Sequence, residues 1–154
     1  MERIAFNKLP AGFYAALNHV QNYVDNCGLD FTLLELVRLR VSQLNGCAFC
    51  LDMHSKDALN HGESFQRLIS VSAWRETPYY TPQEQAALAF AERLTVINNL
   101  EDNDDIHEEL NQYFSKDEIA NLTLAIIQIN SWNRLVKSIG PVPGNYQPAK
   151  LQEA

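Results

Sequence analysis

Residues 30–62 read DFTLLELVRLRVSQLNGCAFCLDMHSKDALNHG, and this stretch predicts the central part of the fold. Asp30 is a good helix N-cap, and apolar residues that recur after it at steps of three and four predict one buried helix face. Gly46 can interrupt that helix, and a second helix is predicted from about Cys47 to His61, where a glycine follows. The apolar positions of the first helix are Leu33, Leu36, Val37, Val41 and Leu44.

Helical periodicity and capping residues indicate further helices along the chain. Thr81-Pro82-Gln83-Glu84 and Ser115-Lys116-Asp117-Glu118 each form a capping box in front of an apolar run. Ser64 to Val71 predicts a short helix. A helix near the N-terminus is predicted from the apolar residues of one face, Leu9, Phe13, Leu17, Val20 and Val24.

Two segments are predicted to lie outside long helices. Residues 102–105 are all Asp or Asn and predict a solvated loop that caps a short helix ending near Phe114. Residues 141–144 contain two prolines, which fix φ and remove a backbone donor, so an extended tail is predicted over 141–154.

The sequence predicts an all-α protein, because no segment shows the period-two alternation of a strand. About seven helices of about 8–22 residues account for the chain. A length of 154 residues corresponds to a single domain, 1–154. The composition, with 46% hydrophobic and 20% charged residues, is that of a globular protein rather than a disordered or fibrous one.

Charge and hydropathy exclude several classes of partner. The net charge is −7, and the 12 Lys and Arg residues form no basic run, so nucleic acid is not expected as a partner. No apolar stretch approaches the roughly 20 residues needed to span a membrane, and residues 1–6 contain no apolar core of a signal peptide. Three cysteines are not a secreted disulfide framework. A cytoplasmic location, without membrane association, is therefore expected.

Cys47-Ala48-Phe49-Cys50, followed by His54, is the pattern that carries chemistry. On a helix that advances about 100° per residue, Cys47, Cys50 and His54 share one face, and Cys50 neighbours both of the others. The thiolate is the reactive form of cysteine, and a nearby imidazole or a helix N-terminus lowers the thiol pKa. Two such thiols can alternate between dithiol and disulfide, so the pair is predicted to be redox-active.

A cysteine pair with this spacing also has other uses. A zinc site could combine Cys47, Cys50 and His54 with a fourth ligand, although structural zinc sites usually place their ligand pairs on separate short elements. The candidates for that fourth ligand are Glu35, Cys27 and His61. Covalent haem needs His directly after the second cysteine, where Leu51 stands, and a thioredoxin-like motif needs a βαβ unit. A buried, inert pair stays open; no metal or cofactor is predicted.

The chain also resembles a known family. Glu35, Arg38-Leu39-Arg40, residues 45–50 and His54 resemble the core of the AhpD-like alkylhydroperoxidases, which belong to the all-helical carboxymuconolactone decarboxylase superfamily. The likeness continues through residues 74–76, 84–92 and 130–134, and it covers about residues 30–137. It is strongest to the single-domain branch and implies an AhpD-like helical bundle.

The resemblance implies a thiol-dependent peroxidase that reduces hydrogen peroxide or organic hydroperoxides. Glu35, Cys47, Cys50 and His54 would form its proton-relay site, with Cys50 attacking the peroxide and Cys47 resolving the sulfenic acid as a disulfide. A dithiol reductant protein or a lipoyl-type donor would restore both thiols. Similar proteins assemble as trimers or hexamers, so a homo-oligomer is expected. Carboxymuconolactone decarboxylases proper lack the CxxC pair, which favours the peroxidase branch.

The residues alone leave the attacking cysteine open. The position of Cys47 at the helix N-terminus favours Cys47, because the helix dipole stabilises a thiolate there. His54 stands four residues after Cys50 and can act as its base, and on this ground we predict that Cys50 attacks. Glu35 could orient His54 or accept a proton through water. Phe49 departs from those peroxidases that carry His between the two cysteines, which implies a weaker or differently coupled relay.

Other residues received structural roles. His61 is expected to interact with the helix dipole, and Cys27 to be structural or unreactive. Trp74 and Trp132 are predicted in a core or an interface. The polar residues of an otherwise apolar helix need partners, and a subunit interface is one place for Asn130, Asn133 and Arg134.

Three alternative functions stay open beside the peroxidase. The first is a disulfide oxidoreductase or redox sensor without peroxidase activity. The second is a non-enzymatic oligomeric module with structural or zinc-binding cysteines. The weakest is decarboxylation of a lactone acid, which rests on superfamily membership alone.

Overall fold

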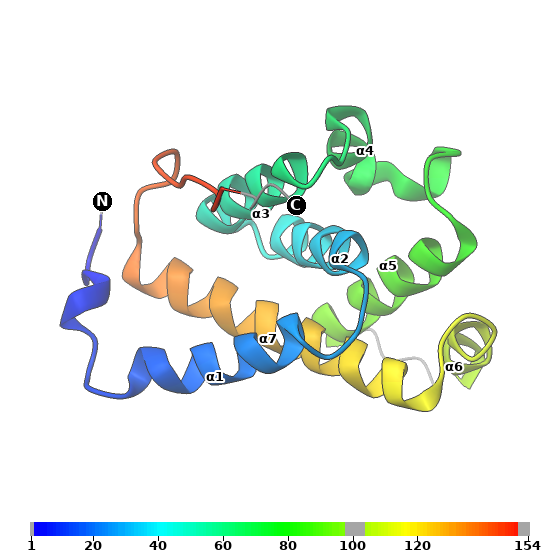
Figure 1. Ribbon diagram of the computed structural model, residues 1–154, viewed down its shortest axis with the longest axis horizontal. Helices are drawn as coiled ribbons and strands as arrows, with labels where there is room; N and C mark the ends of the chain where they lie inside the picture. Colours follow the sequence, from blue (N-terminus) through cyan, green and yellow to red (C-terminus); the bar gives the residue numbers. More distant parts are fainter. Residues whose placement is uncertain (1, 98–103, 151–154) are drawn as a thin grey trace.

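The computed structural model describes residues 2–97 and 104–150, and within them it contains seven α-helices, two short 3₁₀ helices and no strand (Figure 1). The all-α prediction with about seven helices is therefore confirmed. The elements are η1 (Phe6–Lys8), α1 (Phe13–Asp25), α2 (Phe31–Leu44), α3 (Ala48–Asn60), α4 (Phe65–Ser70), η2 (Val71–Glu76), α5 (Pro82–Thr95), α6 (Asp104–Leu110) and α7 (Lys116–Ile139).

Helix α2 is the central element, and it packs against α3, α5 and α7. One apolar cluster joins α2 to α5, α6 and α7, and it includes Val37, Val41 and Ile126. A second cluster on another side of α2 joins it to α3, η2 and α5 and includes Leu36 and Ala58. In Figure 1, α1 runs beside the long α7, and the two pack together. Because α2 is enclosed by both clusters, its polar residues Glu35, Arg38 and Ser42 are buried as well.

Local capping signals predicted the helix starts correctly. The side chain of Asp30 accepts a hydrogen bond from the backbone N–H of Leu33 at 3.0 Å. The capping boxes that open α5 and α7 are both formed, at Thr81 and Ser115. Gly46 takes a left-handed conformation, with φ of +60°, and separates α2 from α3. These signals act within a few residues, so the sequence alone contains them.

Several predicted details are wrong. Leu9 lies outside α1, because Gly12, with φ of +82°, is the N-cap of a helix that begins at Phe13. Leu44 is 36% exposed rather than buried, since α2 ends there. The loop predicted at 102–105 lies partly outside the described residues, and its last two positions already belong to α6, which ends at Leu110. The 3₁₀ helix η2 was not predicted.

Asn130, Asn133 and Arg134 of α7 find hydrogen-bond partners inside the chain. Asn45 donates its side-chain amide to the side-chain oxygens of Asn130 and Asn133, at 3.0 and 2.9 Å. Asn133 donates to the hydroxyl of Ser42, and Arg134 donates to the backbone and side chain of Asn130. These bonds meet the need for partners that the sequence predicts for the three side chains, and a subunit interface at this position stays a prediction.

The C-terminal tail is extended over residues 141–150, apart from a turn at 143–144; residues 151–154 lie outside the described part of the chain. It runs along α3, where Lys56 donates to the carbonyl oxygens of Gly144 and Tyr146, each at 3.0 Å. Asn60 donates to the carbonyl of Ala149, also at 3.0 Å. The tail is thus fixed to one helix by hydrogen bonds to its backbone.

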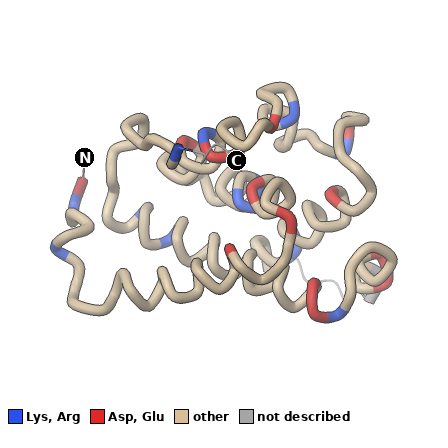
Figure 2. Tube along the Cα trace, in the orientation of Figure 1, with Lys and Arg blue, Asp and Glu red and all other residues tan. Residues whose placement is uncertain are grey.

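Charged side chains are dispersed over the molecule. Figure 2 shows Lys and Arg interspersed with Asp and Glu along the trace. Of the helices in residues 2–97 and 104–150, none combines the length and the apolar content that crossing a membrane requires.

Substitutions at two adjacent residues of α7 test which face of the helix contributes to the free energy of unfolding. Ile126 is fully buried in the first apolar cluster, whereas its neighbour Ile127 is 53% exposed. Ile126→Ala is expected to lower the free energy of unfolding by about 2–5 kcal/mol, through lost burial and a cavity. Ile127→Ala should change it by less than about 0.5 kcal/mol. Urea denaturation measures both, and equal losses would contradict the packing described.

Candidate active site

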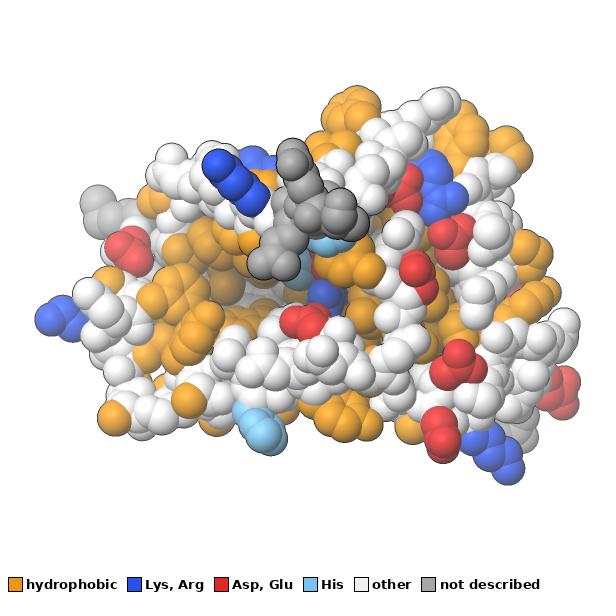
Figure 3. Space-filling model, viewed as in Figure 1, with side chains coloured by type: hydrophobic (Ala, Val, Ile, Leu, Met, Phe, Trp, Pro, Cys, Tyr) orange, Lys and Arg blue, Asp and Glu red, His pale blue; other side chains and the backbone are white. Residues whose placement is uncertain are grey.

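A cavity of about 790 Å³ lies between α1, α2, α3, α7 and the tail. Figure 3 shows a hollow on this face with hydrophobic side chains around much of it and charged side chains at one end. Ligand sites commonly have such a volume, mostly apolar walls and a few polar groups. The aromatic lining residues are Phe6, Tyr14, Phe31, Phe49, Trp132 and Tyr146.

The two cysteines of the CxxC motif lie at the start of α3. Cys47 is the N-cap and Cys50 lies in the first turn; they form a disulfide, with their Cα atoms 5.4 Å apart. Both are only 1% exposed, and they pack with Val136, Phe6 and Phe49. Cys50 is the member of the pair that lines the cavity. A molecule in the cavity would therefore meet Cys50.

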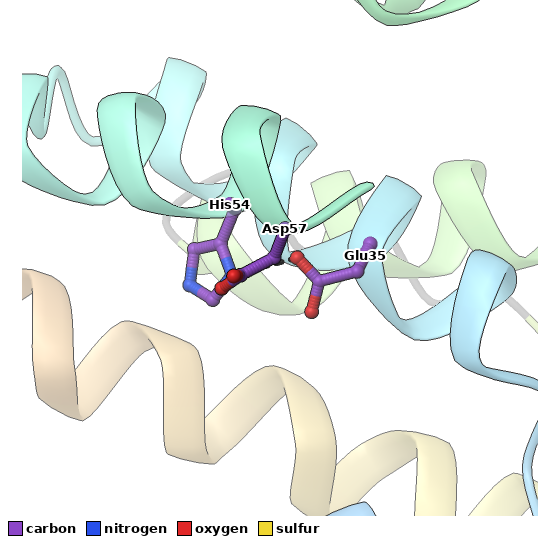
Figure 4. A group of neighbouring side chains, drawn as sticks. All are labelled: Glu35, His54 and Asp57. Atoms are coloured by element: carbon purple, nitrogen blue, oxygen red, sulfur yellow. Dashed lines mark hydrogen bonds and ion pairs between the residues drawn. The ribbon is translucent and has the colours of Figure 1, made fainter. Parts of the chain in front are cut away.

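His54 lies one helical turn after Cys50 and also lines the cavity. Its Nδ1 atom is 2.9 Å from Oε2 of Glu35, which comes from α2 (Figure 4). Both side chains are buried, at 4% and 2% exposure. The packing of α2 against α3 thus brings together two residues that are 19 positions apart in the sequence.

Arg38 completes a chain of ionic contacts behind His54. Its Nη1 donates to Oε1 of Glu35 at 2.8 Å, and its Nη2 donates to Oδ1 of Asp25 at 2.5 Å. Burial by itself raises the pKa of Glu35, but the charges and hydrogen bonds of His54 and Arg38 outweigh burial and hold that pKa below its ordinary value. Glu35 is therefore an ionised acceptor at neutral pH.

An ionised Glu35 fixes the orientation of the imidazole. Because a carboxylate only accepts hydrogen bonds, the proton between the two groups is assigned to Nδ1 of His54. In the neutral ring the other nitrogen, Nε2, is then the acceptor. The arrangement can take a proton from a neighbouring thiol and stabilise the imidazolium that results.

One group of potential metal ligands occurs among the described residues: Glu35, His54 and Asp57, whose ligand atoms lie within 4.8 Å of one another. Each of them already has a partner, since Glu35 is bonded to His54 and Arg38, and Asp57 to the hydroxyl of Tyr146. The zinc set considered from the sequence needs thiolates, and the Cys47–Cys50 disulfide offers none. The contacts fit a proton network better than a metal centre.

Four residues of this site were not predicted as site residues, and of these only Arg38 is part of the sequence that carries the family resemblance. Arg38 and Asp57 were detectable in principle, because Arg38 stands one turn from Glu35 and Asp57 one turn from His54. Asp25 and Tyr146 come from α1 and the tail, and no local pattern links them to the motif.

The other residues singled out from the sequence have these positions. Trp74 is buried in the second apolar cluster, as predicted. Trp132 packs against the first apolar cluster and also lines the cavity. His61 is the C-cap of α3, where its ring stacks on Phe31 with the centroids 3.8 Å apart. Cys27 is a free, partly buried cysteine.

The carboxymuconolactone decarboxylase family model matches residues 11–93, more than half of the chain. The chain belongs to the carboxymuconolactone decarboxylase family. The uncharacterized protein YdfG of Bacillus subtilis is 34% identical over 139 residues, which cover 90% of this chain and 95% of YdfG. The predicted family is therefore confirmed.

Relatives with names that bear on activity are also similar. The crystal structure of ATU0492 from Agrobacterium tumefaciens, a protein of unknown function and a candidate antioxidant defence protein AhpD, matches with a TM-score of 0.90 and 38% identity. That match covers 95% of this chain and 100% of the other. The alkyl hydroperoxide reductase AhpD of Coxiella burnetii is 34% identical over 71 residues, 44% of this chain and 37% of that protein. The AhpD-like fold is confirmed.

The buried ion pair can be tested through its cation. Arg38→Met leaves the carboxylate of Glu35 buried with less compensation, which is expected to cost about 3–5 kcal/mol of the free energy of unfolding. Arg75→Met is the control, because the Arg75 side chain is 58% exposed and an exposed pair contributes at most about 1 kcal/mol. Denaturant titration at pH 7 measures both losses, and equal values would contradict the importance of the buried pair.

The same variant has an expected pH dependence. The pKa of Glu35 lies below its ordinary value of 4.5 in the folded chain, so its contribution to stability is present above the unfolded pKa and is lost as the pH falls through the folded pKa. A protonated Glu35 no longer needs Arg38. The difference in stability between wild type and Arg38→Met should therefore narrow as the pH falls below 4.5.

Proposed function

We propose that this chain is a thiol-dependent peroxidase that reduces hydroperoxides through a dithiol–disulfide cycle of Cys47 and Cys50. The observation that carries the proposal is the position of Cys50, which lines an apolar cavity one helical turn from the buried His54–Glu35 pair. The similarity to the alkyl hydroperoxide reductase AhpD of Coxiella burnetii supports the same activity.

In the first step, Nε2 of His54 takes the proton of the Cys50 thiol, and the thiolate attacks one oxygen of the peroxide. An S–O bond forms and the O–O bond breaks. The leaving oxygen takes the proton from the His54 imidazolium and departs as an alcohol, or as water when the substrate is hydrogen peroxide. Cys50 is oxidised by two electrons to a sulfenic acid.

In the second step, the Cys47 thiol condenses with the sulfenic acid. An S–S bond forms and water leaves, which gives the Cys47–Cys50 disulfide present in the structure. A donor dithiol then reduces this disulfide by thiol exchange and is itself oxidised. We propose a dithiol reductant protein or a lipoyl-type group as donor. The low exposure of both cysteines favours a slender group that can enter the cavity.

Two observations support Cys50 as the attacking residue. It lines the cavity, and it is one turn from His54, whereas Cys47 is two turns from His54. The helix N-terminus favours a thiolate at Cys47, but that position lacks the adjacent base. Cys47 in the role of resolving thiol requires only contact with Cys50, which the disulfide demonstrates.

The cavity supports organic hydroperoxides as the preferred substrates. Its volume of about 790 Å³ far exceeds what hydrogen peroxide needs, and its aromatic walls offer an apolar substrate a favourable environment. Phe49, the residue between the two cysteines, is part of these walls and packs on Phe6.

A disulfide oxidoreductase or redox sensor is the second candidate, and the disulfide itself is the observation that favours it. It differs from the peroxidase in predicting negligible direct reaction with peroxide. A cytoplasmic location remains our prediction, as does a homo-oligomer of three or six chains, which the mass in solution would reveal. Exposed apolar side chains such as Phe65 and Ile69 support the assembly.

Serine variants separate the two cysteines. Reduced wild-type protein should lose two thiols for each hydroperoxide consumed, measured by stopped flow and thiol titration. Cys50→Ser should slow this reaction by about 10³-fold or more, because the nucleophile is gone. Cys47→Ser should react once and stop at a sulfenic acid on Cys50, which dimedone can trap.

Cys27→Ser is the matched control, because Cys27 is a free cysteine outside the proposed site. It should turn over like wild type with a dithiol donor. Peroxide consumption by Cys50→Ser at the wild-type rate would refute the assignment, and a sulfenic acid on Cys47 would reverse the two roles.

Phe49→Ala tests the preference for organic substrates. The variant should lose about tenfold in kcat/KM for cumene hydroperoxide, because it removes an aromatic contact worth about 1.5 kcal/mol. The value for hydrogen peroxide should change by less than about twofold, since that substrate is too small to need the contact. Ile127→Ala, at a residue of α7 that is 53% exposed and does not line the cavity, is the control. Equal losses in kcat/KM for both peroxides would contradict the role of Phe49 in binding the organic group.

A further inference from the structure

The proposed cycle leaves one carboxylate of the cavity without a role. Asp57 lies on α3 one turn after His54, it is half-buried, and it lines the cavity. A carboxylate oxygen of Asp57, one of Glu35 and a ring nitrogen of His54 all lie within 4.8 Å of one another. Figure 4 shows the three side chains directed toward one another, Glu35 from α2 and the other two from α3. Two carboxylates therefore lie close to a single imidazole.

The tail supplies the partner of Asp57. The hydroxyl of Tyr146 lies 2.8 and 3.0 Å from the two carboxylate oxygens of Asp57 and donates its proton to them. Hydrogen bonds from Lys56 to the carbonyls of Gly144 and Tyr146 fix the backbone on this side, and Asn60 binds the carbonyl of Ala149 further on. Tyr146 is thus held in one position over the carboxylate.

The two carboxylates differ in what compensates their charge. Glu35 is bonded to the full positive charge of Arg38. Asp57 is bonded to a phenol, and burial together with the hydrogen bond to Asp57 raises the pKa of Tyr146, so that partner is neutral. The negative charge of Asp57 consequently remains available to a cation that forms beside it. His54 is the group that becomes such a cation in the proposed cycle.

We propose that Asp57 and Tyr146 form a positioning pair for His54: the carboxylate of Asp57, oriented by Tyr146, stabilises the imidazolium that forms when His54 takes the proton of Cys50. This inference rests on the proposed function in one respect, since it assumes that His54 deprotonates Cys50. It gives the C-terminal tail a role in the reactivity of a cysteine at the other end of α3.

Several titratable groups face Asp57 and enter its pH dependence. Burial raises the pKa of Asp57, the hydrogen bond from Tyr146 lowers it, and Glu35 raises it again; the net pKa lies above its ordinary value. The groups that act on Asp57 are Glu35 on α2, His54 and His61 on α3, and Tyr146 on the tail. The charged residues Asp25, Arg38 and Lys150 line the same cavity.

The pKa of the Cys50 thiol is the readout, because it does not depend on peroxide. It can be followed by thiolate absorbance against pH in reduced protein that carries Cys47→Ser and Cys27→Ser. Asp57→Asn keeps the shape of the side chain and removes its charge. It should raise the pKa of Cys50 by about one unit, which is a tenfold smaller thiolate fraction at neutral pH.

Tyr146→Phe should have a smaller effect with a distinct pH dependence. Without the hydroxyl the pKa of Asp57 rises, so its charge and its support of His54 are lost at a higher pH than in the parent protein. The acid limb of the thiolate titration, which is the pH range in which the thiolate absorbance is lost on acidification, should shift upward by about half a pH unit. Tyr79→Phe, which removes a hydroxyl bonded to Gln66 on the surface, is the control and should leave the titration unchanged.

Each outcome decides the inference. The inference is overturned if the pKa of Cys50 in Asp57→Asn lies within about 0.2 units of the parent value. Circular dichroism must show that this variant is folded. If Asp57→Asn does not fold, Tyr146→Phe decides, and an unmoved acid limb overturns the pair. A shifted pKa in protein that consumes no peroxide would support the pair and refute the peroxidase. An unshifted pKa of Cys50 in protein that does consume peroxide would refute the pair and support the peroxidase.

Discussion

A carboxylate in the interior of an apolar helical bundle requires compensating charge and hydrogen bonds, and Glu35 receives them from two directions. Arg38 contributes a cation from the same helix, and His54 contributes a ring nitrogen from α3. Apolar residues of similar volume would often hold such a bundle together as well. The buried charges are therefore better explained by what they do to His54 than by their contribution to stability, and the orientation of the imidazole follows from them.

The pairing of Glu35 with His54 depends in turn on the corner between α2 and α3. Gly46 adopts the left-handed conformation that ends α2 and lets the chain reverse, and Cys47 caps the helix that follows. Apolar contacts that include Leu36 and Ala58 then hold the two helices together. A residue with a Cβ at Gly46 would strain this corner. The same corner that brings His54 to Glu35 also puts Cys47 at the N-cap of α3 and Cys50 in its first turn.

Sequence reasoning succeeded where the determining interactions are local and failed where they are not. Asp30, Thr81 and Ser115 cap helices through contacts within three residues, so the sequence predicts those helix starts. Cys50 and His54 share a face by helical spacing alone. Asp25 and Tyr146 reach the site only through the packing of α1 and the tail, which no periodicity encodes. The apolar face of α1 was predicted from its periodicity, but Val24 is the one buried residue of this helix, and Tyr14 lines the cavity.

Two local effects favour different cysteines as the attacking residue, and access to the cavity decides between them. The helix dipole acts most strongly on Cys47 at the N-cap, whereas the base lies next to Cys50. Both sulfurs are equally buried from bulk water, so exposure does not discriminate between them. The cavity discriminates between the two cysteines, because Cys50 lies in its wall beside the apolar surface that would hold a substrate. A thiolate gains nothing from a favourable dipole if the electrophile cannot reach it, and in the proposed mechanism that constraint outweighs the electrostatic preference.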